Sequence, residues 1–234
     1  MISQLTFLDL VKILFPTILI FMKIVQVDLN KDYSEAVQEA VRVLASGGVI
    51  VCPTDTLYGI GCNALDNIAV RKIFEIKDRS FSKPLPIVVR NIKWAKELAD
   101  VKKRNEKVLD KIWPGRVTAV LPKKEIVPDI VTSNQKTVGI RIPDHPLIDA
   151  ILKIFGYPLA LTSANISGEE PTQDINKIIE IFSKRLTRQP DMILDVGILP
   201  KSEPSAILDL TGDKPKISRV GPSKPEEFLK LLNI

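Results

Sequence analysis

Short apolar runs alternate with amphipathic segments along almost the whole chain, and this alternation constrains the fold more than any other feature. Residues 23–29 and 49–51 have the pattern of strands, and residues 36–44 between them have apolar residues at helical spacing. Asp32 and Glu35 form a capping box in front of this helix. Chains in which strands and helices interleave form a sheet covered by helices, so the sequence predicts an α/β fold. Because some connections between strands are helical and others are short, the predicted sheet is mixed.

The alternation continues toward the C-terminus without a break in composition. Asp66 and Asp144 each stand where the N-cap of a helix is expected, and Gly156 stands where the second of these helices would end. No linker-like segment divides the chain, so residues 23–234 are predicted to form a single domain. The further predicted strands lie near residues 58–65, 85–89, 117–121, 137–142, 158–162, 192–195, 206–210 and 216–220. Further helices are predicted near residues 66–76, within 92–112 and near 144–155. Another helix begins at residue 172 or 174, and the last begins at a second capping box formed by Ser223 and Glu226.

Residues 1–22 form an apolar extension before the first predicted strand. The uncharged run 13–22 is shorter than the roughly 20 residues that a membrane-spanning helix needs, and Asp9 and Lys12 interrupt the apolar residues before it. Lys12 is the only basic residue before this run, and no small-residue cleavage site follows, which argues against a signal peptide. We therefore expect that the true start lies near Met22 and that the protein does not associate with a membrane. A membrane-surface or partner-binding helix is the alternative.

The charge of the chain favours anionic ligands without indicating a general nucleic-acid binder. The net charge is +5 and the pI is about 9.1, but no long run of Lys and Arg occurs. The most basic segment, residues 184–188, has the composition of the solvated end of a helix. Cys52, Cys62 and His145 are too few for a disulfide framework or for a closed Cys/His zinc site. A cytoplasmic protein with buried free cysteines is therefore expected.

Polar side chains follow the predicted strand 49–51 on a tight loop, in the order Pro53-Thr54-Asp55-Thr56. Short polar side chains on a loop at a strand end suit the binding of a small polar ligand. The next segment, Gly59 to Ala64, matches the G-x-G-x-x-A dinucleotide-binding fingerprint, but the loop separates it from the strand that the fingerprint requires. A Rossmann site is therefore disfavoured. The chain also lacks a P-loop motif and the G-x-S-x-G motif of serine hydrolases.

A second segment is cationic and contains Lys77, Arg79 and Lys83. Lys77 and Arg79 are two residues apart, so in an extended loop both side chains point to the same side. Pro84 favours an extended conformation at Lys83, the residue before it. Three cations near one edge of a sheet suit a triphosphate ligand. The alternative is a solvated surface loop.

A third segment, residues 162–168, follows a predicted strand and is rich in hydroxyl and amide side chains, which suits either a ligand-binding loop or a simple turn. Arg141 interrupts another run that otherwise has the pattern of a buried strand. An unpaired buried guanidinium is very costly, so Arg141 needs a protein carboxylate or a ligand carboxylate as its partner. Ser205 and Arg219 lie in two later strand regions and indicate little by themselves.

Taken together, five segments occur in the order found in the YrdC family, and the chain resembles that family over roughly residues 30–222. The resemblance implies a twisted, open, mixed α/β sheet with flanking helices around a large concave basic cavity. It also implies a threonylcarbamoyl-AMP synthase, which makes threonylcarbamoyl-AMP and pyrophosphate from L-threonine, bicarbonate and ATP. A separate threonylcarbamoyl transferase complex would then modify tRNA. The five segments are Pro53–Gly59, Lys77–Ser80, Ser163–Gly168, Pro204–Asp209 and Arg219–Gly221.

The resemblance further implies a role for each matching residue. Thr56, Arg141 and Ser205 would bind threonine. Lys77 and Arg79 would be the catalytic cations, and Mg²⁺ would enter with ATP without dedicated protein ligands. The residues implied to bind ATP are Arg79, Lys83, Thr118, Ser163, Asn165 and Arg219.

Two positions depart from the family pattern. Ser80 stands where a proline often follows the arginine of the cationic loop, and the change affects loop stiffness more than chemistry. Val88 stands where some members have a threonine-binding histidine. The choice between threonine and serine as substrate therefore stays open.

The implied reaction brings several anions together, and no matched residue is an obvious general base. We therefore expect catalysis mainly by positioning and by electrostatic stabilisation from the cations. One alternative is a module that binds double-stranded RNA or tRNA without turnover. Another is a related carbamoyl-transfer domain of hydrogenase maturation, although such domains usually belong to much longer chains.

Overall fold

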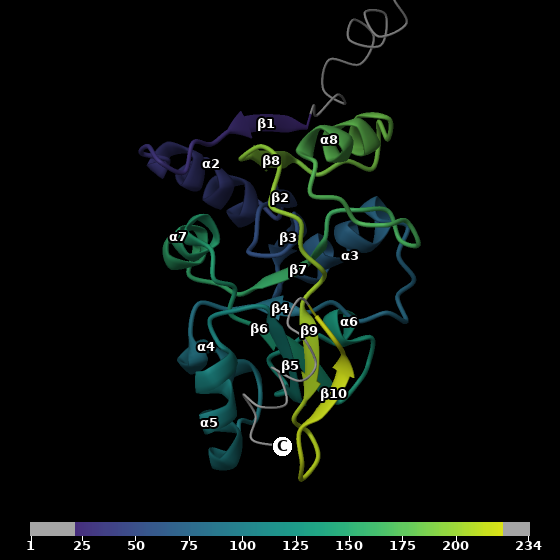
Figure 1. Cartoon of the computed structure of the whole chain (residues 1–234). Helices are drawn as coiled ribbons and strands as arrows, with labels where there is room; N and C mark the ends of the chain where they lie inside the picture. The colour runs from purple at the N-terminus through teal and green to yellow at the C-terminus, as the bar shows by residue number, and fades with distance from the viewer. Residues whose placement is uncertain (1–21, 222–234) are drawn as a thin grey trace, which may run out of the picture.

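The predicted mixed sheet is present as one ten-stranded sheet within residues 22–221, which are the residues that this computed structural model describes (Figure 1). Its strands are β1 (Lys23–Gln26), β2 (Ile50–Cys52), β3 (Gly59–Asn63), β4 (Ile87–Val88), β5 (Val117–Pro122), β6 (Thr137–Arg141), β7 (Leu159–Ser163), β8 (Met192–Asp195), β9 (Ala206–Asp209) and β10 (Lys216–Arg219). Their order across the sheet is β1-β8-β2-β3-β7-β4-β6-β5-β9-β10. Parallel pairs such as β5 with β9 stand beside antiparallel pairs such as β3 with β7, so the expectation of a mixed sheet is confirmed.

Helices connect many of the strands. They are α2 (Ser34–Ala45), α3 (Asn67–Ile76), α4 (Ile92–Leu98), α5 (Lys103–Ile112), α6 (Asp129–Thr132), α7 (Pro146–Phe155) and α8 (Ile175–Ser183). Between residues 22 and 221, none of the helices has the length and apolar character needed to cross a membrane. The expectations for residues 1–21 and for a helix from Ser223 fall outside the described residues.

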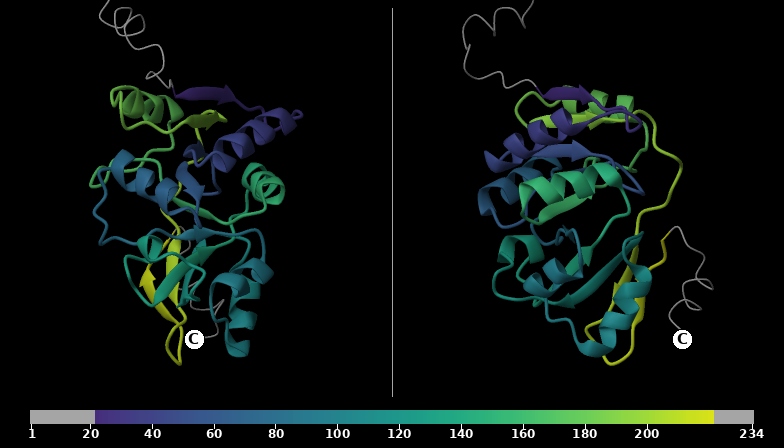
Figure 2. Two further views of the ribbon diagram at one scale, coloured as in Figure 1. Left: turned by 180° about the vertical axis from the view of Figure 1, so that it is seen from behind. Right: turned by 90° about the vertical axis from the view of Figure 1, so that its left-hand side faces the viewer.

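Helices cover both faces of the sheet (Figures 1 and 2). Successive residues of a strand pack into different layers. Ile50 of β2 belongs to a buried cluster that contains Leu152 of α7, and α7 packs against α2 in this layer. The next residue, Val51, belongs to a second buried cluster that contains Phe182 of α8. This alternation is the period of two that a strand imposes. The buried strands therefore form a rigid floor for the loops at their ends.

The sheet is strongly twisted: β1 and β8 at one end run in a clearly different direction from β9 and β10 at the other end (Figures 1 and 2). Such a twist accumulates strand by strand from the right-handed twist of each strand. The helices α4 and α5 lie beside the half of the sheet that contains β5 and β6 (Figure 1). The fold is therefore the twisted, open sheet with flanking helices that the sequence predicts.

The glycines of the G-x-G-x-x-A match have a packing role. Gly59 and Gly61 belong to β3, where a Cβ atom would lie 2.8 Å and 2.5 Å, respectively, from side-chain atoms of Leu161 on β7. A side chain at either position would force the two strands apart. The absence of a helix directly after Gly59 agrees with the low weight given to a Rossmann site.

Several predicted element boundaries were wrong, and prolines explain two of them. The strand expected at 85–89 is only the two residues of β4, because Pro84 and Pro86 lack the N–H that a sheet ladder needs. Asp144 does not cap α7: the N-cap is His145, held extended in front of Pro146 at the first helical position. The short helix α6 was not predicted.

The helix N-caps were predicted with mixed success. Asp66 caps α3 as predicted, since its Oδ1 accepts hydrogen bonds from the backbone of Ile68 and Ala69. Asp32 lies one residue before the N-cap of α2, which is Tyr33, and its carboxylate accepts from Ser34. The predicted position of the first cap was therefore wrong by one residue.

We predict that Asp66→Ala lowers the free energy of unfolding by about 1 kcal/mol, because two backbone N–H groups of α3 lose their acceptor. Asp66→Asn keeps an acceptor at the same place and serves as the matched control. Urea unfolding of both variants measures the effect. Equal stability of Asp66→Ala and the unchanged protein would contradict the assigned cap.

Candidate functional site

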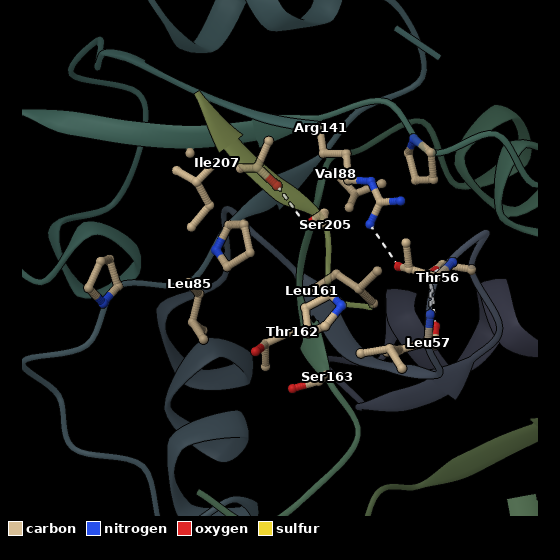
Figure 3. A pocket seen from close by; sticks show the side chains of 18 of the residues that line it. Thr56, Leu57, Leu85, Val88, Arg141, Leu161, Thr162, Ser163, Ser205 and Ile207 are labelled. Carbon is tan, nitrogen blue, oxygen red and sulfur yellow. Dashed lines mark hydrogen bonds between the residues drawn. The ribbon is translucent and has the colours of Figure 1, made fainter. Parts of the chain in front are cut away.

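One cavity of about 460 Å³ collects most of the predicted site residues (Figure 3). It lies where the β2–β3 loop, the loop after α3, and the strands β5, β6, β7, β9 and β10 meet. Figure 3 shows Thr56, Arg141, Ser163 and Ser205 around the same hollow, although they come from distant parts of the sequence. The predicted residues that line it are Thr56, Arg79, Thr118, Arg141, Ser163, Ser205 and Arg219.

A compact turn fixes Thr56 at the wall of the cavity. The Thr54 hydroxyl donates to the Leu57 carbonyl at 2.7 Å and accepts from the backbone N–H groups of Thr56 and Leu57 at 3.2 Å. The two threonine hydroxyls are 3.1 Å apart. Side-chain hydrogen bonds to nearby backbone are the means by which threonine stabilises such turns. The Thr56 hydroxyl is therefore held in place by its own loop.

Arg141 is buried at the end of β6, and its predicted need for a partner is met by a protein carboxylate. Its Nη2 donates to Asp55 Oδ1 at 2.6 Å, its Nη1 to Thr56 Oγ1 at 3.1 Å, and its Nε to the Gly115 carbonyl at 2.9 Å. Asp55 was not predicted as this partner, although it belongs to the quoted Pro53–Gly59 segment. The side chains of both ionic partners are less than 10% exposed.

The guanidinium of Arg141 keeps capacity for a ligand. It has five N–H donors, of which the three bonds to described residues use three. Its pKa lies below the ordinary value because burial disfavours the charged form, and the Asp55 carboxylate partly offsets this shift. The two donors that remain suit a carboxylate, which binds a guanidinium through two oxygens.

A second corner of the cavity joins Thr118, Ser205 and Arg219. The hydroxyls of Thr118 and Ser205 lie 3.2 Å apart, and Arg219 Nε donates to the Ser205 carbonyl at 2.9 Å. These bonds link β5, the segment before β9, and β10. Burial lowers the pKa of Arg219, which increases the benefit of an anionic partner.

Arg79 reaches the cavity from the loop after α3. Its guanidinium donates to the carbonyls of Lys83 and Pro84, at 3.1 Å and 2.8 Å, and so closes the loop on itself. Asp78 anchors the same loop from outside through Arg185 at 2.7 Å and Arg188 at 2.6 Å. The basic segment 184–188 is therefore not only a solvated helix end, because two of its arginines hold the loop that presents Arg79.

Lys77 does not extend beside Arg79 as predicted. It is the C-cap of α3, Asp78 after it has a positive φ, and the lysine side chain is buried at 1% exposure. Its Nζ lies 2.5 Å from the Ser163 carbonyl, 2.5 Å from the Asn165 carbonyl and 3.3 Å from Asn165 Oδ1. The prediction of an extended loop was wrong because three oxygens of a distant loop draw the ammonium inward.

The remaining predicted residues lie beside the cavity. Asn165 is buried next to it, and its Oδ1 accepts from the Ser163 hydroxyl at 2.6 Å. Lys83 is exposed, and its carbonyl rather than its ammonium is the group bonded to Arg79. Lys77, Lys83 and Asn165 are absent from the described wall of the cavity, so contact of these residues with a ligand stays a prediction.

The lining of the cavity is basic. Arg79, Arg141 and Arg219 line it, and no Asp or Glu does so among residues 22–221. The same residues contain no group of three or more His, Cys, Asp or Glu side chains that could hold a metal ion. Val88 lines the cavity and gives it an apolar wall at the position noted in the sequence. A site of this kind fits an extended ligand with several negative charges.

The fold and the cavity define an α/β protein with a basic cavity at one side of its sheet, and the sequence assigns it to a family. The profile of the Sua5/YciO/YrdC family, described as telomere recombination, matches residues 42–221, so the chain belongs to this family. A relative from Methanocaldococcus jannaschii is 39% identical over 194 residues, which cover 82% of this chain and 89% of the relative. A threonylcarbamoyl-AMP synthase from Coxiella burnetii is 32% identical over 185 residues, which cover 78% of this chain and 97% of that enzyme.

Solved structures agree with this assignment. Sua5 from Pyrococcus abyssi complexed with L-threonine has a TM-score of 0.82 and 31% identity, and the match covers 91% of this chain. The match spans 61% of the P. abyssi chain, so this chain corresponds to part of that protein. The resemblance to the YrdC family inferred from the sequence is thereby confirmed.

We predict that the buried Lys77 gives the protein a distinctive pH-dependent stability. Burial, with a smaller effect of the Arg79 charge, lowers the pKa of Lys77 from 10.5 to about 7. The unfolded chain therefore binds more protons than the folded protein between these pH values, and the contribution of Lys77 to the free energy of unfolding rises with pH across this window.

Chemical unfolding between pH 7 and 10 gives the free energy of unfolding of the unchanged protein and of Lys77→Met. The value for the unchanged protein minus the value for Lys77→Met should rise by about 1 kcal/mol or more from pH 7 to pH 10, since one pKa unit corresponds to about 1.4 kcal/mol. Lys107→Met, at an exposed position of α5, is the matched control and should show no such trend. A constant difference for Lys77→Met would contradict the assigned environment of Lys77.

Proposed function

We propose that this protein is a threonylcarbamoyl-AMP synthase, which makes threonylcarbamoyl-AMP and pyrophosphate from L-threonine, bicarbonate and ATP. The observation that supports this most is the joint cavity, in which three arginines and several hydroxyls meet and which no carboxylate of residues 22–221 lines. Membership of the Sua5/YciO/YrdC family supports the same activity, since relatives from that family have this name.

The amino acid would bind at the Arg141 end of the cavity. The two remaining N–H donors of Arg141 suit the threonine carboxylate; the Thr56 hydroxyl is bonded to the same guanidinium, and Ser205 lines the same cavity. The apolar side chain of Val88 would contact the substrate from the β4 side. This wall can contact the methyl group that distinguishes threonine from serine, which favours threonine by a modest factor.

ATP would occupy the part of the cavity between the loop after α3 and β10. Arg79 and Arg219 suit its phosphates, and Thr118 and Ser163 supply hydroxyls beside them. Lys83 is on the exposed side of the same loop and would add positive charge at the entrance. Lys77 and Asn165 would act through the shape of the Ser163 loop, because their polar atoms bond to each other and to that loop.

The reaction would proceed in two steps in this site. The threonine amine attacks the bicarbonate carbon and, with loss of water, forms a carbamate. A carbamate oxygen then attacks the α-phosphorus of ATP, and the bond from this phosphorus to the bridging oxygen breaks, so pyrophosphate leaves with the electron pair. Both reactants are anions, so the three arginines would lower the barrier by offsetting their repulsion.

Mg²⁺ would enter with ATP. Mg²⁺ commonly binds substrate phosphates and several waters with few protein carboxylates, and the described lining of the cavity provides none. The donor set of the cavity therefore fits a metal ion held mainly by the nucleotide. When bound, Mg²⁺ would neutralise phosphate charge during displacement of pyrophosphate.

The product is a reactive mixed anhydride, so a second enzyme has to consume it. We infer that a threonylcarbamoyl transferase complex uses it to modify tRNA in the cytoplasm, where ATP and tRNA are both present. Salt-sensitive binding of double-stranded RNA without pyrophosphate release would instead favour the interpretation as an RNA-binding module.

We predict that Arg79→Ala lowers the rate of pyrophosphate release by about 100- to 1000-fold, because it removes one preorganised charge from the site. The rate is measured with ATP, L-threonine and bicarbonate, and omission of any one of them should abolish release. Lys107→Ala removes an exposed positive charge from α5 and should keep the full rate. Equal rates for the two variants would contradict the proposed role of Arg79. Release that is unaffected by omission of threonine and bicarbonate would contradict the proposed function.

A further inference from the structure

The turn that ends α3 sets the direction of Arg79, and it has an unusual residue at its centre. Lys77 is the C-cap of α3. The backbone N–H of Asp78 donates to the Glu75 carbonyl at 3.4 Å. The backbone N–H of Arg79 donates to the Phe74 carbonyl at 2.9 Å. These two bonds form a Schellman motif, in which the residue after the C-cap is left-handed and is usually glycine. Here that residue is Asp78, with a φ of 48°.

The side chain of Asp78 has contacts that a glycine would lack. A left-handed conformation is disfavoured for a residue with a side chain, although Asp and Asn adopt it more readily than most. The Asp78 Oδ2 accepts from Arg185 Nη2 at 2.7 Å, and its Oδ1 accepts from Arg188 Nη1 at 2.6 Å. Each carboxylate oxygen is thus bonded to a different arginine, and these contacts offset the backbone cost of the aspartate.

The two arginines belong to a turn that is bonded to the end of α8. Phe182 of α8 is fully buried, and its carbonyl accepts from the backbone N–H of Arg185 at 3.0 Å. The same carbonyl accepts from the side-chain amide of Gln189 at 3.0 Å. The backbone N–H of Arg188 donates to the Arg185 carbonyl at 2.9 Å. The ion pairs of Asp78 therefore join the end of α3 to a segment that is itself held by the core.

The same contacts direct the charge of Asp78 away from the cavity. Hydrogen bonds from Arg185 lower the pKa of Asp78, so its carboxylate is ionised at neutral pH. Arg79 is its neighbour in the chain, but the Arg79 guanidinium donates to the backbone carbonyls of Lys83 and Pro84. No Asp or Glu of residues 22–221 lines the cavity that Arg79 lines. The positive charge of Arg79 is thus available to a ligand while Asp78 is bound elsewhere.

We propose that Asp78 is a positioning residue: its ion pairs with Arg185 and Arg188 hold the turn after α3 so that Arg79 meets the phosphates of ATP. Asp78 is absent from the described wall of the cavity, so its effect reaches the nucleotide through Arg79. This inference rests on the proposed function, because ATP is the ligand that the proposal assigns to Arg79.

The sign of the effect on ATP separates positioning from a simple effect of charge. Asp78→Asn removes a negative charge near a basic cavity, and long-range attraction alone would then strengthen ATP binding. Loss of the anchor acts in the opposite direction, because Arg79 then has to be ordered when ATP binds. Asparagine also tolerates a positive φ, so this substitution removes the ion pairs and keeps the turn.

We expect Asp78→Asn to raise the KM for ATP about three- to fivefold, since partly exposed ion pairs are of modest strength. The KM for L-threonine should stay unchanged, because the proposed threonine site lies at Arg141. Pyrophosphate release at varied ATP and at varied threonine measures both values. A KM for ATP that is unchanged or lower would overturn the inference and leave the proposed function intact.

Lys184→Gln is the matched control for loss of an ion pair. Lys184 belongs to the same basic segment as Arg185, but it pairs with Glu180 at 2.6 Å and not with the turn after α3. Both KM values should therefore stay unchanged in this variant. A KM for ATP that rises equally in Lys184→Gln and Asp78→Asn would overturn the inference, because the effect would then belong to the segment and not to its bonds with Asp78.

Two further variants test the route of the effect. In Arg79→Ala the group that Asp78 positions is absent, so adding Asp78→Asn should not lower the rate of pyrophosphate release further at subsaturating ATP. Arg185→Gln combined with Arg188→Gln keeps Asp78 and should raise the KM for ATP at least as much as Asp78→Asn does. Urea unfolding checks that each variant is folded, and the double arginine variant decides the question if Asp78→Asn is not.

The remaining outcomes are also decisive. A further loss of rate when Asp78→Asn is added to Arg79→Ala would show that Asp78 acts by another route, and would overturn the inference. An unchanged KM for ATP in the double arginine variant would overturn it as well. If the unchanged protein releases no pyrophosphate from ATP in the presence of L-threonine and bicarbonate, the proposed function is overturned, and the inference falls with it.

Discussion

The buried ion pair between Asp55 and Arg141 is the interaction on which the rest of the site depends. It joins the loop after β2 to the end of β6, and its partners are 86 residues apart in the sequence. An unpaired charge at either place would be very costly, so the pair fixes both segments at one wall of the cavity. Because Arg141 also bonds to Thr56 and to the Gly115 carbonyl, the same guanidinium ties the β2–β3 loop and the loop before β5 to the end of β6. The pair is thus structural in the free protein and places a positive group where an anionic substrate can meet it.

A second buried basic side chain organises the other side of the cavity in the same way. The Lys77 Nζ donates to oxygens of Ser163 and Asn165, and so ties the end of α3 to the loop after β7. Asp78, which follows it, pairs with Arg185 and Arg188 in the segment after α8, whereas Arg79 lines the cavity. Three consecutive residues therefore have three different contacts. Lys77 bonds to buried oxygens, Asp78 pairs with two arginines near the surface, and Arg79 lines the cavity.

No carboxylate is present in the described cavity lining, so the positive charges of its arginines are available to an anionic ligand. Arg79, Arg141 and Arg219 lie on different strands or loops, so the sheet holds them apart at positions that a flexible peptide could not maintain. Preorganised charges stabilise a developing negative charge without reorganisation during the reaction. Leu161 packs closely over Gly59 and Gly61 in the neighbouring strand, and Leu161 and Gly59 both line the cavity. The fold thus supplies positioning and electrostatics, which are the two effects that a phosphoryl-type displacement needs most.

The sequence by itself determined the features that depend on neighbours in the chain. The alternation of strands and helices indicated the α/β fold, and the order of the motifs identified the family. Asp66 and Asp174 marked the starts of two helices, because each caps backbone N–H groups only two or three residues further along the chain. Only the tertiary structure decided which of two partners Arg141 takes and which way Lys77 points. The carboxylate of Asp55 and the carbonyls of Ser163 and Asn165 lie more than 80 residues away, and no local pattern specifies such a contact. Local periodicity reports which face of an element is buried, whereas the partner of a buried charge is set by what the folded sheet brings next to it.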